Sequence, residues 1–414
     1  MKRRILGTLG VLAIIIAVVL VMNIGKIQRL VRVNSLFEAD KIVHNFSNMD
    51  ALMFTHDHPI SAQPYVWGVT PTPLPKQVTI AGQDRNLSEW LNEAAATALL
   101  IVSGDDIVYE QYYSDTTQSD RRISWSMAKS FLSALVGTAV ERGEIGSLDD
   151  QVTDYVSALK GSAYDGATIR NVLNMSSGVA FNEDYLDKNS DINKMGRVLA
   201  LGGSMDDFSA GINSRARAPG SARQYVSIDT HVIGMVLRAA TGKTVHDIFD
   251  ERLWSQVGFG ADSYYMTDGG DRAFVLGGLN MRTRDYALFG KLMRDGGIYQ
   301  GKQIIPAEWV AQSTSNNAPA SAPGSHNDAS VGYGYQWWVP PVSADSDFAG
   351  DYFAVGIYGQ YIYVNPALDI VIAKNAAHLE FMSPGQSGKG YMMENIDVFR
   401  SLAKHYGRTS AGQP

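Results

Sequence analysis

Cysteine is absent from the 414 residues of this chain. Disulfide bonds, thiolate metal sites, thiol nucleophiles and anchorage through a lipidated cysteine are therefore all excluded. A chain without cysteine is compatible with an oxidising compartment, although the absence is not evidence for one.

Long runs of basic residues are also missing, and the formal charge is −7 at pH 7. Binding to phosphates needs clustered lysine and arginine, so nucleic acid is not expected as a partner. Scattered acidity of this size mainly keeps a protein soluble. The apolar fraction of 45% is ordinary for a globular protein and is enough to supply a core.

One long apolar run is present, at the N-terminus. Three basic residues precede residues 5–24, which are apolar except for two glycines, a threonine and an asparagine. Twenty helical residues rise about 30 Å, the thickness of a bilayer core. The run is longer than the apolar region of a typical signal peptide, and no A-x-A-like site follows it. We therefore expect an uncleaved single-pass transmembrane anchor over residues 1–30, with a cleaved signal peptide as the alternative. Basic residues flank both ends of the run, so charge gives no orientation.

Five prolines lie between residues 59 and 75. Proline discourages regular structure, so residues 31–86 are expected to form an irregular arm packed along the main domain. His56 and His58 lie in this arm and suggest metal ligands. Two histidines without a third defined ligand are more often a polar turn, so we expect neither a metal site nor a cofactor.

Strand patterns open and close the remaining sequence. Residues 98–102 and 107–113 are β-type runs joined by a Ser-Gly-Asp-Asp turn, which is typical of a hairpin. Strand patterns return over residues 333–339, 352–357, 360–364 and 370–374, and a last helix is expected over 392–405. Helical and loop patterns dominate between the two groups. We therefore predict that both ends of the domain contribute to one sheet, with a mainly helical region inserted.

Ser126 and Lys129 form an S-x-x-K motif at the start of a helix predicted over residues 127–142. This spacing places both side chains on about the same helix face, where the amine can accept the hydroxyl proton. The positive potential of a helix N-terminus favours an oxyanion and a neutral amine. A lysine that acts as a base near neutral pH must be partly buried or close to other cations.

The four-residue motif alone is a weak signal. Ser157 and Lys160 match it too, and a serine at a helix start is often only a cap. Gly161 follows the second copy, whereas a long apolar helix follows Ser126. Ser126 is therefore the candidate nucleophile.

A second signal, Tyr225-Val226-Ser227, comes about a hundred residues later, before an apolar helix predicted over 232–240. A phenol opposite the serine can relay its proton to a leaving group, and the alternative is an ordinary core tyrosine. The third signal is Gly356-Ile357-Tyr358-Gly359-Gln360, predicted to lie inside a strand. Glycine in a strand often marks close approach of a ligand or backbone, and the alternative is a bulge.

In order and spacing, these three signals resemble the S-x-x-K, Y-x-N and K-T-G motifs of the serine β-lactamase and penicillin-binding-protein-like hydrolases. Within that group the chain is most similar to class C β-lactamase relatives, serine esterases and 6-aminohexanoate-oligomer hydrolases. Supporting stretches lie at residues 173–178, 277–287, 288–292 and 306–309. The resemblance covers residues 87–406 and implies an α/β (α+β), β-lactamase-like fold. In that fold an antiparallel sheet from both chain ends is flanked by helices and carries an inserted, mainly helical subdomain. Residues 407–414 would be a disordered tail.

The resemblance also implies roles for single residues. Ser126 would be the acylated nucleophile, Lys129 its proton acceptor, and Tyr225 a general base or proton relay. Gly359 would match the glycine of K-T-G. The N–H groups of Ser126 and Gln360 would form the oxyanion hole. The catalytic domain would lie outside the cytoplasmic membrane, on the periplasmic side.

Two departures from the family pattern bear on the substrate. Ser227 replaces the asparagine of Y-x-N. Ile357 and Tyr358 replace the lysine and threonine of K-T-G, and isoleucine cannot receive a substrate carboxylate as that lysine does. We therefore expect a hydrolase of small, neutral esters or amides. Arginines at 215, 217 and 223, just before Tyr225, are the alternative source of the missing charge.

Two other functions stay open. The first is a β-lactamase or peptidoglycan D-alanyl peptidase. The second is a catalytically silent, membrane-anchored relative that binds its ligand without turning it over. The sequence does not indicate the oligomeric state.

Overall fold

The computed structural model describes residues 2–323, 330–343, 345–382 and 389–407. The predicted hairpin forms from β5 (Ala96–Ser103) and β6 (Asp106–Tyr112), which pair antiparallel. Near the other end of the chain, β16 (Ile370–Ala376) pairs antiparallel with β5. The two ends of the domain therefore share one sheet, as the sequence predicts.

This sheet has eight strands, in the order β12-β13-β14-β15-β16-β5-β6-β2. All neighbours are antiparallel except β2 and β6. The strands not yet named are β2 (Gly68–Val69), β12 (Gly332–Tyr333), β13 (Trp338–Val339), β14 (Tyr352–Gly356) and β15 (Gln360–Asn365). The strand predicted over residues 333–339 is thus two short strands. They are separated because Gln336 turns the chain with φ +65°.

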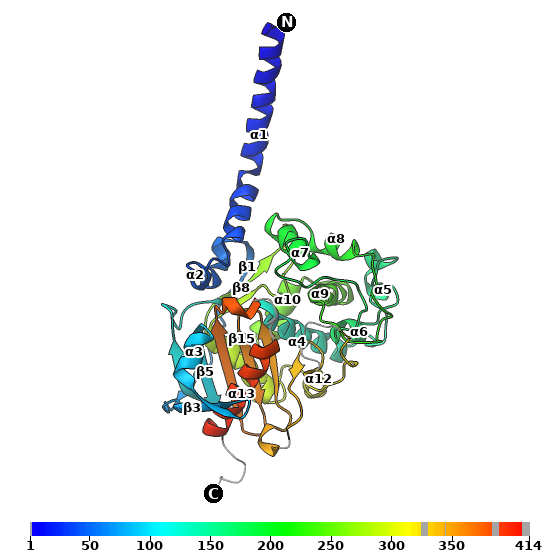
Figure 1. Ribbon diagram of the computed structural model, residues 1–414. Helices are drawn as coiled ribbons and strands as arrows, with labels where there is room; N and C mark the ends of the chain where they lie inside the picture. The colour runs from blue at the N-terminus through cyan, green and yellow to red at the C-terminus, as the bar shows by residue number, and fades with distance from the viewer. Residues whose placement is uncertain (1, 324–329, 344, 383–388, 408–414) are drawn as a thin grey trace.

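Helices cover both faces of the sheet (Figure 1). On one face, α13 (Lys389–Tyr406) and α3 (Leu87–Glu93) bury a core that contains alternate residues of β5. The other alternate residues of β5 join a second core with α11 (Thr283–Arg294) and α4 (Ala128–Glu141). A Cβ on Gly290 of α11 would come within 2.5 Å of a Val371 methyl group, so glycine there lets α11 approach the sheet closely.

A mainly helical region lies between β7 (Arg122–Ile123) and β8 (Ser263–Thr267). Its central helix, α4, is buried from residue 128 to residue 139 and packs against α9 (Ser227–Thr241) and α12 (Ala307–Ser313). The other helices of the region are α5 (Val152–Tyr155), α6 (Ile169–Leu173), α7 (Asp191–Ala200), α8 (Met205–Ala210) and α10 (Val245–Phe249).

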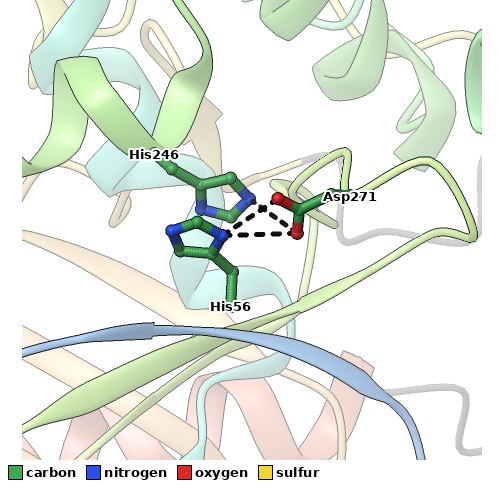
Figure 2. Close-up of side chains that lie close together, drawn as sticks. All are labelled: His56, His246 and Asp271. Atoms are coloured by element: carbon green, nitrogen blue, oxygen red, sulfur yellow. Dashed lines mark hydrogen bonds and ion pairs between the residues drawn. The ribbon is translucent and has the colours of Figure 1, made fainter.

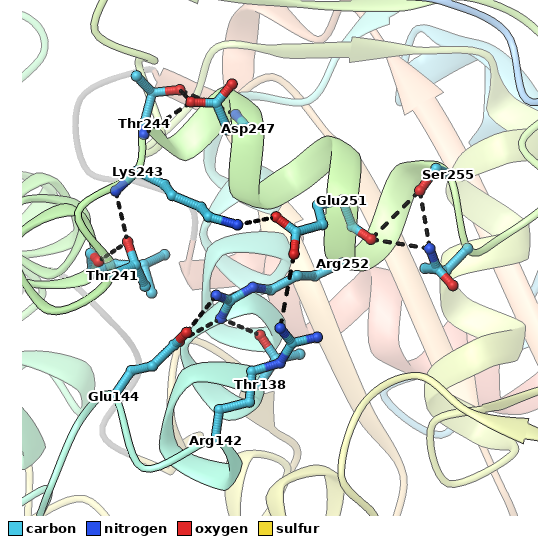
Figure 3. Close-up of polar contacts among 12 residues, drawn as sticks. Thr138, Arg142, Glu144, Thr241, Lys243, Thr244, Asp247, Glu251, Arg252 and Ser255 are labelled. Atoms are coloured by element: carbon cyan, nitrogen blue, oxygen red, sulfur yellow. Dashed lines mark hydrogen bonds and ion pairs between the residues drawn. The ribbon is translucent and has the colours of Figure 1, made fainter.

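A buried ion pair joins the C-terminal end of α4 to the π-helical turn η4 (Asp250–Trp254). The Arg252 guanidinium donates two hydrogen bonds to the Glu144 carboxylate, at 2.7 and 2.8 Å. The guanidinium also lies 3.4 Å from the Thr138 hydroxyl. Arg252 therefore links η4 both to α4 and to the residues that follow α4 (Figure 3). Glu251 next to it is shared between Lys243 and Arg142 nearer the surface.

The arm before the main domain is more regular than its prolines suggest. It contains α2 (Ile42–Ser47), β1 (Phe54–His58) and a hairpin of β3 (Gln77–Ile80) and β4 (Gln83–Asn86). β1 pairs with β8 in a four-stranded sheet ordered β1-β8-β9-β7, in which β9 is Leu279–Met281. The polar turn predicted at residues 56–58 is therefore wrong: these residues form a strand because β8 supplies the backbone partners.

The N-terminal segment forms a long helix, α1 (Lys2–Asn34), which projects away from the domain (Figure 1). Its C-terminal end is fixed by Arg29, which donates to the carbonyl of Ala200 and stacks over the Phe54 ring at 3.5 Å. Among the described residues, no helix has the length and apolar character needed to cross a membrane, so the predicted transmembrane helix is not supported. Residues 408–414 of the predicted tail lie outside the described residues.

Candidate active site

Ser126 lies where the chain leaves β7 and enters α4. It is the middle residue of a single 3-10 turn, η2 (Trp125–Met127), and is half-buried. Trp125 has φ +44°, a backbone region that bulky residues rarely occupy and that persists only where the surroundings hold it. The backbone before it is held by the N–H of Ser124, which donates to Leu279 of β9. The candidate nucleophile is therefore presented by a strained turn fixed between a strand and the central helix.

Lys129 lies one turn further along and is 1% exposed. Its Nζ donates to the carbonyl of Leu276 at 3.0 Å and lies 5.4 Å from the centre of the Tyr225 ring. Burial lowers the pKa of Lys129 to about 7, against the opposing attraction of Glu183 and Asp229. A substantial fraction of the amine is thus neutral near pH 7, as the S-x-x-K chemistry requires.

Tyr225 lies just before α9 and completes the group. Its hydroxyl lies near the side chains of Ser126 and Ser227, which lower the pKa of Tyr225 by hydrogen bonding. Its ring stacks on Trp338 of β13, with 5.6 Å between centres. Burial raises the pKa of Tyr225 above its ordinary value, while the hydrogen bond from Ser126 opposes this shift. The structure therefore brings the Ser126, Lys129 and Tyr225 side chains together.

Glu183 is a site residue that the sequence reasoning missed. Its carboxylate accepts hydrogen bonds from the backbone N–H and the hydroxyl of Ser227, the latter at 3.2 Å, and from the Tyr185 hydroxyl at 3.2 Å. Loss of hydration raises the pKa of Glu183, and the Ser227 hydrogen bonds and the charge of Lys129 oppose that rise. Ser227 thus acts as the bridge between this carboxylate and Tyr225.

A second missed acid, Asp229, lies one residue beyond Ile228 in the first turn of α9. It is completely buried and accepts hydrogen bonds from Tyr164 at 2.8 Å and Ser177 at 2.9 Å. Burial raises the pKa of Asp229 to about 8, so the group is mostly protonated at pH 7. Neither acid stands in a recognisable motif, and no periodicity in the sequence marks either as buried.

The glycine-flanked segment is a hairpin turn and not the interior of a strand. Residues 357–359 connect β14 to β15, and the reversal requires φ +63° at Tyr358 and φ +91° at Gly359. A Cβ on Gly356 would come within 2.2 Å of the Ser124 carbonyl, so the end of β14 lies directly against the turn that carries Ser126. The close approach predicted from the two glycines is present, whereas the strand is interrupted.

Gln360 is the first residue of β15 and is completely buried. Its side-chain amide donates to the carbonyl of Ala376 at 2.7 Å and accepts from Asn375 at 3.1 Å. These contacts fix the backbone of β15 beside η2, against which β14 and β15 both pack. The oxyanion hole of Ser126 and Gln360 N–H groups stays a prediction.

An aromatic cluster lies beside the nucleophile and consists of four residues, Phe37, Phe46, Trp125 and Tyr358. Phe37 stacks on Tyr358 with 4.9 Å between ring centres and an angle of 21°. Phe46 meets Tyr358 edge to face at 5.5 Å and Trp125 at 5.6 Å. The N-terminal arm therefore packs directly on the two residues that adjoin the candidate site, which the sequence does not indicate.

The three arginines considered as substitutes for the missing lysine have protein partners. Arg215 donates to the carbonyls of Ala163 and Asp165. Arg223 donates to the carbonyl of Val331 at 2.7 Å. Arg217 hydrogen-bonds the side chain of Gln224, the neighbour of Tyr225.

The fold and this arrangement are those of serine hydrolases with a β-lactamase-like architecture. A Beta-lactamase family model matches residues 89–388, so the chain belongs to the β-lactamase family. It is 26% identical to the 6-aminohexanoate-dimer hydrolase of Paenarthrobacter ureafaciens over 310 residues, 73% of this chain and 78% of that protein.

Solved structures agree on the fold. A protein from Bacillus anthracis described as a candidate 6-aminohexanoate-dimer hydrolase is 24% identical and superposes with a TM-score of 0.77, covering 89% of this chain and 96% of its own. A penicillin-binding protein from Bacillus halodurans is 15% identical with a TM-score of 0.56, covering 71% and 97%. These likenesses show a shared fold, and the family predicted from the three motifs is confirmed by the family model.

Proposed function

We propose that the protein hydrolyses an ester or amide of a small molecule through an acyl-enzyme on Ser126. The neutral amine of Lys129 accepts the proton of the Ser126 hydroxyl as its oxygen attacks the substrate carbonyl. Tyr225 passes a proton to the leaving alcohol or amine as the carbon–heteroatom bond breaks. The Lys129 ammonium returns its proton to Tyr225. Water then attacks the acyl-enzyme as Lys129 takes up one of its protons. The bond between the Ser126 oxygen and the acyl group breaks as that proton returns to the serine oxygen, and the free acid leaves.

The observation that supports this mechanism best is the hydrogen bond between Ser126 and Tyr225 beside a buried lysine whose pKa is close to neutrality. The base, Lys129 Nζ, lies 5.4 Å from the centre of the Tyr225 ring, so nucleophile, base and relay are neighbours, an arrangement that a ligand-binding relative without catalysis does not need. The N–H groups of Ser126 and Gln360 stabilise the negative charge that develops on the carbonyl oxygen.

The substrate we propose is neutral and apolar near the reacting carbonyl. Ile357 and Tyr358 stand where the family carries a cation and a short polar residue, and the aromatic cluster adds apolar surface beside them. A charge-assisted hydrogen bond to a carboxylate is typically worth about 1.5–3 kcal/mol, and this position does not provide one. The relative named for 6-aminohexanoate dimers supports amides as well as esters as substrates.

Two assays on one preparation test the proposal. A fluorophosphonate probe should label the wild type stoichiometrically and leave Ser126→Ala unlabelled. In parallel, kcat/KM for short p-nitrophenyl esters should exceed that for a chromogenic cephalosporin by at least about tenfold, as expected from the missing charged contact. Absence of labelling would favour the silent binding relative. Efficient cephalosporin turnover with negligible esterase activity would favour a β-lactamase, and loss of that turnover in Arg217→Ala would identify its carboxylate contact.

A further inference from the structure

Three histidines from distant parts of the sequence meet at the outer edge of the small sheet. His56 and His58 lie on β1, and His246 lies on α10. Asp271, from the connection between β8 and β9, lies beside His56 and His246 (Figure 2). The coordinating atoms of His56, His246 and Asp271 all lie within 4.8 Å of one another. The fold thus supplies the third ligand whose absence argued against a metal in the sequence.

The separations within this group are close to those of a metal site. His56 Nδ1 lies 3.3 Å from Asp271 Oδ1 and 3.0 Å from Asp271 Oδ2. His246 Nε2 lies 4.0 Å from Asp271 Oδ1. Around a tetrahedral zinc ion with bonds of about 2.0–2.1 Å, ligand atoms are about 3.3 Å apart. The two imidazole rings are stacked, with 3.9 Å between centres and an angle of 11°. Figure 2 shows that both rings direct a nitrogen toward the carboxylate.

A chain of close polar contacts lies behind His246. His58 is completely buried, and its Nδ1 lies 2.6 Å from the Asp250 carboxylate. His58 Nε2 lies 3.4 Å from His246 Nδ1. The other ring nitrogen of His246, Nε2, is buried and has no hydrogen-bond partner among the described residues.

This arrangement is what a metal-bound histidine requires. Its second ring nitrogen is held by another group, which fixes the tautomer and aims the free nitrogen at the ion. Leaving a buried polar atom without a hydrogen bond is unfavourable, and Nε2 of His246 is such an atom among the described residues.

We propose that His56, His246 and Asp271 bind one divalent transition-metal ion, with Zn²⁺ as the ion that suits them. Two imidazole nitrogens and one carboxylate oxygen favour such an ion over Ca²⁺ or Mg²⁺, which take oxygen ligands. Three protein ligands leave a fourth position for water, which can enter because His56 and Asp271 are partly exposed.

The position of the site points to a structural role. β1 and β7 are the two edges of the four-stranded sheet, so the ion lies on the opposite edge from the strand that leads to Ser126. An ion there would link strand β1 of the N-terminal arm to α10 and to the β8–β9 connection. This inference does not depend on the proposed hydrolytic function, and its test reads binding rather than turnover.

The test uses the full-length chain, purified without a polyhistidine tag and stripped with a chelator. Zn²⁺ titrated in competition with a chromophoric chelator should bind at one equivalent, and Co²⁺ should give the absorption bands of a tetrahedral site. His56→Ala and Asp271→Asn should each weaken Zn²⁺ binding at least tenfold. His405→Ala, which removes an exposed histidine of α13, should bind as the wild type does.

Both site variants replace partly exposed side chains, so circular dichroism and melting without metal should match the wild type. Added Zn²⁺ should raise the melting temperature of the wild type and of His405→Ala, but not of His56→Ala. The proposal is overturned if the wild type binds less than one equivalent. It is overturned equally if His56→Ala and Asp271→Asn bind Zn²⁺ as tightly as the wild type, since the ion would then be adventitious.

Discussion

At the residue scale, Ser126, Lys129 and Tyr225 are proposed to act as one proton-transfer unit. Ser126→Ala should abolish turnover, and Lys129→Ala and Tyr225→Phe should each lower kcat by several powers of ten, because members of such a unit are not independent. Steady-state kinetics on a p-nitrophenyl ester measure these losses. Ser157→Ala in the second S-x-x-K motif is the matched control and should keep full activity. Near-wild-type turnover by Ser126→Ala would remove the basis of the mechanism.

The pH dependence follows from the lowered pKa of Lys129. The base must be neutral, so kcat/KM should rise with pH through about 7 and level off above it. The Glu183 carboxylate favours the charged ammonium, so it holds this pKa up. Glu183→Gln keeps the size and the acceptor oxygen but removes the charge, and it should move the acidic limb to lower pH by about one unit.

Glu141→Gln at an exposed position of α4 controls for the loss of one negative charge. A pH–rate profile decides between the outcomes. An acidic limb that stays in place in Glu183→Gln would show that the limb does not report Lys129.

At the element scale, the central helix α4 depends on more than its apolar residues. Glu144→Gln would leave the Arg252 guanidinium buried with a weakened partner. Breaking a fully buried pair costs about 3–5 kcal/mol. The Glu144 side chain is 26% exposed, so the loss should be smaller, but the urea midpoint should still fall. Glu251→Gln, which breaks exposed pairs in the same region, should change it far less. Equal effects of the two substitutions would mean that the buried pair adds no special stability.

The elements also show what the sequence can and cannot predict. Periodicity identifies β5, β16 and α4, and the motif spacing identifies Ser126 and Tyr225, because these signals are local. The turn at Tyr358 is missed since a bulky residue at positive φ depends on packing from Phe37, more than three hundred residues away. Glu183 is missed for the same reason: its burial is decided by α9 and not by its neighbours in the chain.

At the scale of the whole molecule, the location of the protein remains a prediction. The sequence predicts anchorage in the cytoplasmic membrane with the catalytic domain outside, whereas no helix among the described residues is long and apolar enough to span a membrane. Reporter fusions at Ile60 and fractionation of cells measure this directly. A reporter that is active only in the cytoplasm would show the reverse orientation, and recovery in the soluble fraction would exclude the anchor.

The last prediction concerns the N-terminal segment. We expect that most of helix α1 can be removed without loss of stability, whereas the packed part of the arm cannot. Helix α1 projects from the domain (Figure 1), and the packed part of the arm begins at Leu36. Leu36, Ile42, Phe46 and Met49 are at most 4% exposed in the main core. Burying each such side chain contributes about 1.5–3 kcal/mol. Their sum, about 6–12 kcal/mol, is comparable with the whole stability of a typical domain.

Deletion of residues 1–25 should therefore leave kcat/KM and the melting temperature unchanged. Deletion of residues 1–49 should also strip Phe37 and Phe46 from Trp125 and Tyr358, exposing apolar surface next to the nucleophile. We expect this shorter protein to unfold or aggregate and to lose activity. Thermal melting and ester hydrolysis of the two deletions compare them directly. If the shorter protein melts and turns over like the longer one, the arm is a covering of the domain and not part of its core.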